Sequence, residues 1–160
     1  MPTDTDAHRD RREREAWGFA MGTVLVCIAT LVIGNKLPPR DTMGMDVTAV
    51  VLAVVFGTSC GYLWWWHMAG DLPLSARRAL FHAGAVVFCV LSCASIVAGA
   101  VVAAGLNGAF IMHPRFLPSW VQMDVMLVRK FALPLLALMI PWALLWRFIV
   151  NRRHAARMIA

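Results

Sequence analysis

The chain has 160 residues, of which 60% are hydrophobic, and a mean hydropathy of +0.67. A soluble domain is about 45–50% apolar because its surface must face water, so this composition excludes an ordinary soluble fold. The net charge of +6 would suit a nucleic-acid-binding protein, but the basic residues stand at the ends of apolar segments rather than along one face, which indicates membrane topology.

Residues 1–16 form a charged segment with four Arg and five Asp or Glu. Such a segment cannot bury apolar area, so we expect it to be either disordered or a solvated helical lead-in on the cytoplasmic side. The apolar run that follows has no small-x-small cleavage site after it, and we expect it to remain as a membrane span rather than to be removed as a signal.

Four apolar stretches have about the length that crosses a ~30 Å hydrocarbon core. The expected spans are residues 17–34, 45–68, 79–106 and 131–150. Asn35, Pro38 and Pro39 end the first, because consecutive prolines remove amide donors and block helix continuation. The sequence therefore predicts an all-α integral membrane protein, with a four-helix transmembrane bundle over residues 17–150 and a basic cytoplasmic tail over residues 151–160.

A short interfacial helix is expected just before the fourth span, into which it continues. Ser119 and Gln122 have the spacing of a capping box, in which both side chains satisfy free amides at a helix start. Pro134 cannot donate a hydrogen bond to the carbonyl of Lys130, so we expect a bend between the interfacial and the spanning parts.

The orientation follows from the distribution of Lys and Arg. With the N-terminus inside, ten basic residues lie inside and five outside, which favours cytoplasmic N- and C-termini in a multi-pass protein of the cell (inner) membrane. The inside residues are Arg9, Arg11, Arg12, Arg14, Arg77, Arg78, Arg147, Arg152, Arg153 and Arg157; the outside residues are Lys36, Arg40, Arg115, Arg129 and Lys130. Four spans also place Trp17, residues 64–66 and Trp146 at one interface, where indoles settle.

Small residues recur at helical spacing in the first three spans. They are Gly18-x-x-x-Gly22, Gly57-x-x-x-Gly61, and the series Ser95, Gly99 and Ala103. Helices in lipid associate through close packing rather than through a hydrophobic drive. We therefore expect tight helix contacts on these faces, within the bundle, with a membrane-protein partner or with a second copy.

No Asp, Glu, Lys, Arg or His lies near the middle of any expected span. Pumps and ion-coupled transporters generally place ionisable groups or broken helices at that depth, so an autonomous transporter is disfavoured. Ser59 and Ser95 have no histidine at a matching depth, and no catalytic residue is assigned. All four cysteines fall within spans, which excludes an external disulfide framework.

Two histidines could lie at matched depth on neighbouring helices. His67 ends the second span and His82 lies about one turn into the third. Two neutral imidazoles can ligate the iron of a b-type haem. The alternative is that His67 belongs to an aromatic interfacial belt and that His82 is an interfacial polar residue.

Methionines and one histidine on the expected outer side form a second set. Met43, Met45, Met112 and His113 offer the soft thioether and imidazole ligands that suit Cu(I). Cys27, Cys60, Cys89 and Cys93 lie deeper, so a copper path from outer methionines to inner thiols can be drawn. The alternative is that methionine fills gaps at the interface and that buried cysteine acts as a small hydrophobic residue.

Small size, the absence of ionisable groups at mid-span and the small-residue faces together favour a non-catalytic subunit or assembly component of a larger membrane complex. Such a role requires no cofactor. Two other functions stay open: a copper-handling or b-haem membrane protein, and a small exporter that is active only as an oligomer. The expected partners are the lipid bilayer and other membrane proteins, not nucleic acid.

Overall fold

The computed structural model describes residues 4–36, 47–68, 73–105 and 117–159. Within these ranges the chain forms four helices: α1 Asp4–Lys36, α2 Val47–Met68, α3 Ala76–Gly105 and α4 Leu117–Ile159. Each helix contains a stretch that is long and apolar enough to cross a membrane. The predicted all-α fold with four apolar helices is therefore confirmed.

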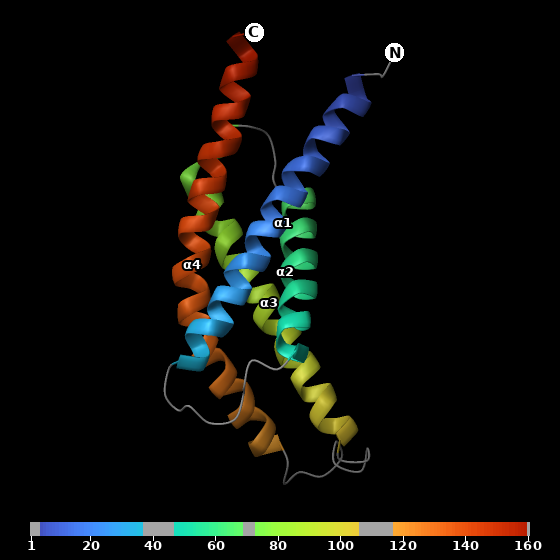
Figure 1. Cartoon of the computed structure of the whole chain (residues 1–160), viewed down its shortest axis with the longest axis vertical. Coiled ribbons are helices and arrows are strands. Elements are labelled where there is room, and N and C mark those ends of the chain that lie inside the picture. The colour runs from blue at the N-terminus through green and yellow to red at the C-terminus, as the bar shows by residue number, and fades with distance from the viewer. Residues whose placement is uncertain (1–3, 37–46, 69–72, 106–116, 160) are drawn as a thin grey trace.

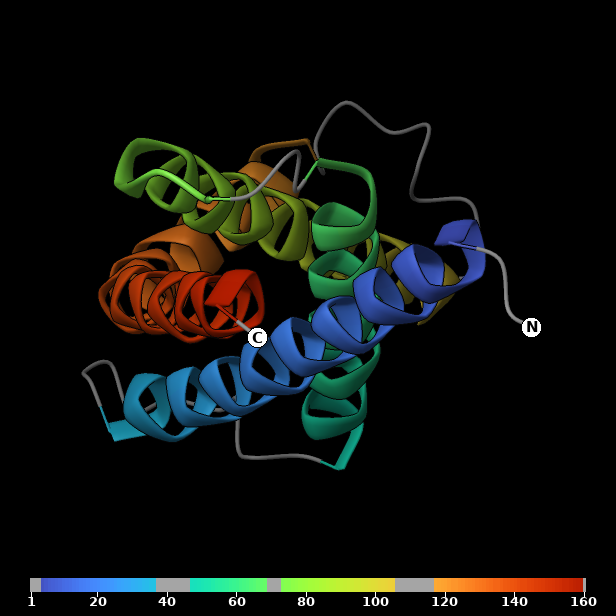
Figure 2. The same ribbon diagram turned by 90° about the horizontal axis from the view of Figure 1, so that it is seen from above.

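The helices are arranged as a ring in which α1 and α3 each contact both α2 and α4. Figure 1 shows the N- and C-terminal ends of the chain at the same end of the bundle, which we call the termini end. The view along the bundle in Figure 2 shows α1 crossing α2 and running beside α4. An even number of antiparallel helices requires this placement of the termini.

α1 is the most buried helix. Its apolar stretch is 50% buried inside the bundle, whereas the apolar stretch of α2 is 17% buried. The residues of its buried stripe recur every three or four positions: Ala16, Ala20, Thr23, Cys27, Thr30 and Gly34. The two threonine hydroxyls donate to the carbonyls of Phe19 and Val26 at 2.9 and 2.8 Å, so neither polar group is left unpaired in the apolar interior.

Gly57 and Gly61 bring the backbones of α2 and α1 together. A Cβ placed on Gly57 would lie 3.1 Å from the Cα of Val24, and one on Gly61 would lie 3.0 Å from the Cα of Ala20. Only hydrogen fits there without pushing the helices apart. The expectation of tight helix packing is confirmed for this pair.

Gly18 and Gly22 have the same spacing but meet side chains of α4. A Cβ on Gly18 would overlap the indole ring of Trp146, and a Cβ on Gly22 would overlap that of Trp142. These two glycines therefore make room for tryptophan rings and not for another backbone. Gly99 and Ala103 of the third small-residue series are among the α3 residues whose side-chain surroundings the structure does not describe.

At the termini end, α1 and α3 begin earlier in the sequence than the predicted spans. α1 already begins at Asp4, which corresponds to the solvated helical form of the N-terminal segment and not to the disordered one. α3 begins at Ala76 because Ser75 caps it: the Ser75 hydroxyl accepts from the amide of Arg78 at 3.2 Å, and the Ser75 carbonyl accepts from the amide of Ala79 at 3.0 Å.

The predicted interfacial segment and the fourth span form one continuous helix, as expected. Residues from Leu117 onward belong to α4, which continues through Pro134 and Pro141 to Ile159. Prolines are tolerated inside apolar helices of this kind because neighbouring groups re-satisfy the freed carbonyls. Figure 1 shows the first turns of α4 inclined to the rest of the helix, so a change of direction is present inside one continuous helix.

Candidate functional site

Aromatic rings from all four helices pack together toward the termini end. This aromatic cluster consists of Phe19 of α1, Trp64 and Trp65 of α2, His82 of α3, and Trp142 and Trp146 of α4. Ring centroids lie 5.0 Å apart for Phe19 and Trp65, 6.2 Å for Trp65 and Trp146, and 5.5 Å for Trp142 and Trp146. Through Trp65 the cluster joins side chains of all four described helices, because its ring lies beside Phe19, His82 and Trp146.

His82 is buried in this cluster and accepts a hydrogen bond. The Nε1–H of Trp64 donates to Nδ1 of His82 at 2.5 Å, and the His82 ring also lies 6.2 Å from that of Trp65. An imidazole nitrogen that accepts a hydrogen bond carries no proton, so a neutral His82 has its proton on Nε2. The residue thereby joins α2 to α3 through a defined tautomer.

This arrangement does not suit haem ligation by His82. One ring nitrogen accepts from Trp64 and the other carries the proton, so no lone pair is free for iron unless the Trp64 contact is given up. His67 lies on the exposed side of α2, whereas His82 is 3% exposed. The haem pair stays a prediction, and the geometry of His82 gives it no support.

Three indole N–H groups of the cluster are buried without a hydrogen-bond acceptor among the described residues. They belong to Trp65, Trp142 and Trp146. A buried donor without a partner costs about 1–3 kcal/mol. Trp65 and Trp146 meet edge to face at an interplanar angle of 77°, a geometry in which the positive edge of one indole faces the negative face of the other.

The sequence pattern did not reveal this cluster, because it placed Trp65 and Trp146 in an interfacial belt. Their side chains are only 2% and 7% exposed. The signal that could have found them is the four-residue spacing of Trp142 and Trp146, which matches the spacing of Gly18 and Gly22. Trp17, 48% exposed, does lie on the outer surface of the bundle.

The cysteines of α2 and α3 lie close together. The Cys60 thiol is within hydrogen-bonding reach of the Cys93 thiol, and Cys89 and Cys27 are its other thiol neighbours. Across the described ranges, no group of three or more His, Cys, Asp or Glu could hold a metal ion. The four residues predicted for copper, Met43, Met45, Met112 and His113, lie outside the described residues.

The turn between α2 and α3 is fastened to α4. The side-chain amide of Asn151 accepts from the Leu74 amide at 2.9 Å and donates to the Leu74 carbonyl at 3.0 Å. The Arg147 Nε–H donates to the same carbonyl at 2.8 Å. These bonds use the side of α4 that carries residues 147 and 151, and they hold the buried Leu74 against the bundle.

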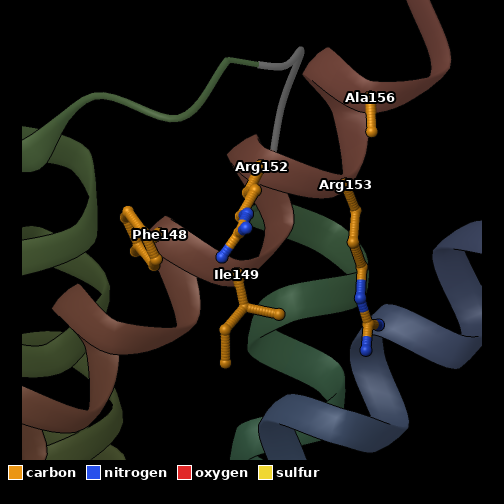
Figure 3. A pocket seen from close by; sticks show the side chains of 5 residues that line it. All are labelled: Phe148, Ile149, Arg152, Arg153 and Ala156. Carbon is orange, nitrogen blue, oxygen red and sulfur yellow. The ribbon is translucent and has the colours of Figure 1, made fainter.

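Another side of α4 near the termini end forms a shallow cleft of about 360 Å³. Phe148, Ile149, Arg152, Arg153 and Ala156 line it. In Figure 3 the two arginine side chains flank that of Ile149, and the helix α1 runs beyond Arg153. The cleft thus has an apolar part and a cationic part.

No protein-family model, curated protein or solved structure matches this chain. The chemistry of its sites is therefore judged from its own residues. The aromatic cluster offers packing and hydrogen-bond donors, the Cys60–Cys93 pair offers two soft ligands, and the α4 cleft offers two guanidinium groups beside an apolar surface.

Proposed function

We propose that this chain is inserted in the cell (inner) membrane through its four apolar helices, with both termini in the cytoplasm. Its proposed role is a non-catalytic subunit or assembly component of a larger membrane complex. The excess of Lys and Arg at the termini end supports the orientation.

The observation that carries this proposal is the length of α1 and α4. The 33 residues of α1 extend about 50 Å at 1.5 Å per residue, whereas a ~30 Å hydrocarbon core needs about 20 residues. The surplus at the termini end, residues 4–16, which we call the α1 extension, is charged, and residues 9, 10 and 12–14 are exposed. Figure 1 shows the ends of α1 and α4 diverging from one another. Two separated helical ends that project beyond the apolar spans are suited to docking a partner protein.

The interior of the bundle supports a packing role as well. The buried polar residues among those described are Thr23, Thr30 and His82, and each makes a hydrogen bond to a neighbouring group. Around them lie aromatic and aliphatic side chains. Such an interior favours a rigid scaffold over a polar path for a substrate.

The test is affinity capture in mild detergent. We expect one other membrane chain to co-purify in fixed stoichiometry, and to be lost when Arg9 and Arg14 of the α1 extension are replaced by Gln. The matched control is the double substitution Arg77→Gln and Arg78→Gln, which removes the same charge from the start of α3. A wild-type protein that purifies alone as a monomer would contradict the proposal.

A second candidate function, copper handling, is favoured by the contact between Cys60 and Cys93. Two thiolates can hold Cu(I), the ion that soft sulfur ligands select. We expect the purified, reduced protein to bind about one Ag(I), used as a redox-inert probe for Cu(I), with proton release because thiols must ionise to bind metal. Cys60→Ser and Cys93→Ser should each abolish this binding, and Cys27→Ala should retain it. Equal binding by all the variants would exclude the pair as the site.

A further inference from the structure

We propose that the cleft on α4 formed by Phe148, Ile149, Arg152, Arg153 and Ala156 binds the headgroup of an anionic phospholipid. The inference rests on the insertion and orientation of the four helices proposed above, and it does not depend on a protein partner. The lipid would come from the leaflet at the termini end.

The cleft lies on a side of α4 that the bundle leaves open. Trp146 and Val150 are buried in the core, and Arg147 and Asn151 are bonded to Leu74. Residues beside and after them in sequence face outward: Phe148 is 61% exposed, and Arg152 and Arg153 are exposed as well. This face is therefore accessible to a lipid arriving from the side.

The order of the residues along α4 matches the order of groups in a phospholipid. Phe148 and Ile149 lie next to the apolar span, and Arg152 and Arg153 lie one helical turn, about 6 Å, nearer the cytoplasm. Trp17, half exposed at the same end of the bundle, is of the residue type that marks the headgroup level. An acyl chain and glycerol would therefore contact Phe148 and Ile149, while the phosphate reaches the arginines.

No described carboxylate compensates the charge of the cleft. Within the described ranges neither Arg152 nor Arg153 has an ion-pair partner, whereas Arg11 on α1 pairs with Glu15 at 3.0 Å. From Val128 to the end of the chain there is no Asp or Glu. Guanidinium groups bind phosphate through paired, charge-assisted hydrogen bonds, and anionic headgroups are attracted to basic residues near the surface. A phosphate group would supply the negative charge that pairs with the two arginines.

Among the described residues, the acids at this end of the bundle are those of the α1 extension. Glu15 is engaged by Arg11, and Asp10 and Glu13 are exposed. Figure 3 shows Arg153 on the side of the cleft toward α1 and Arg152 farther from that helix. We therefore expect phosphate binding to depend more on Arg152 than on Arg153.

The experiment measures lipid binding to the purified full-length protein by native mass spectrometry, with phosphatidylglycerol and phosphatidylcholine as probes. We expect wild-type protein to retain phosphatidylglycerol in preference to phosphatidylcholine. The double variant Arg152→Gln/Arg153→Gln should bind phosphatidylglycerol at least tenfold more weakly, with unchanged thermal stability because both side chains are exposed. The control Arg77→Gln/Arg78→Gln removes the same charge elsewhere and should bind as wild type does.

Two further measurements distinguish the binding of a lipid from the binding of a free anion. Phe148→Ala should weaken phosphatidylglycerol binding severalfold if the acyl region contacts the apolar part of the cleft. Inorganic phosphate at millimolar concentration should not displace the lipid. Equal loss of binding in the two double variants, or displacement of the lipid by inorganic phosphate alone, would overturn the proposal. Loss of a co-purifying protein without loss of lipid would count only against the subunit role.

Discussion

The glycine pairs of α1 and α2 have the same four-residue spacing but meet different neighbours. Gly57 and Gly61 touch the backbone of α1, while Gly18 and Gly22 lie beneath the indole rings of Trp146 and Trp142. One pair sets the distance between two helices, and the other makes room for large side chains from a third. The motif alone does not distinguish these uses, because both require only the absence of a Cβ.

The largest effect is expected for Gly22→Ala. The added methyl would overlap the Trp142 ring, which is held in the aromatic cluster by Phe19 and Trp146. Overpacking of this kind costs roughly 1–3 kcal/mol, and we expect the upper part of that range. Thermal denaturation in detergent measures it. Adding Trp142→Ala should recover part of the loss, as coupled neighbours do in a double-mutant cycle, and strict additivity would contradict the contact.

Gly61→Ala is expected to have the next largest effect. Its Cβ would lie 2.9 Å from the Thr23 hydroxyl and 3.0 Å from the Cα of Ala20, so α1 and α2 must separate by a few tenths of an ångström. We expect a loss of about 1–2 kcal/mol in thermal denaturation. Because the obstacle is backbone, Trp142→Ala should not rescue this variant. Rescue of both glycine variants by the same tryptophan substitution would remove the distinction between the two pairs.

Trp64→Phe tests the hydrogen bond within the aromatic cluster. The substitution keeps an aromatic ring but leaves Nδ1 of the buried His82 without its donor. An unsatisfied buried acceptor costs about 1–3 kcal/mol, and we expect the lower part of that range because a second tautomer is open to histidine. His82→Phe in the Trp64→Phe background should then cost less than His82→Phe alone, as measured by thermal denaturation. Equal costs in the two backgrounds would show that the bond contributes nothing.

Gly84→Ala should have the smallest effect. No atom lies within 4 Å of a Cβ at this position of α3, and alanine favours a helix over glycine by up to ~1 kcal/mol. We expect unchanged or slightly raised thermal stability. A clear loss would mean that this face of α3 is covered by another helix or chain.

Hydrophobic length and turn residues were enough to predict four apolar helices. They could not predict the start of α1, because a balanced run of Arg, Asp and Glu suits a solvated helix as well as a disordered segment. They predicted an interfacial helix that continues into the fourth span with a bend at Pro134, and α4 does continue through this proline. A single proline in an apolar helix bends it without ending it when neighbouring groups compensate the lost hydrogen bond.

The sites were less predictable than the fold. Matched depth suggested His67 and His82 as partners, but the helical rotation of α2 exposes His67 and turns Trp64 toward His82 instead. Depth placed Cys60 level with Cys89, whereas the Cys60 thiol lies within hydrogen-bonding reach of Cys93, one helical turn from Cys89. Depth along a helix can be read from a sequence, whereas rotation about its axis depends on neighbours that are distant in the chain.

The proposed function and the lipid site both depend on the orientation of the four apolar helices in the membrane. Reporter fusions after Pro39, Pro73, Pro114 and Ala160 measure it directly, because each reporter is active on one side of the membrane only. We expect the order outside, inside, outside, inside. A reporter after Ala160 that reads outside, or any pair of successive fusions on the same side, would contradict it.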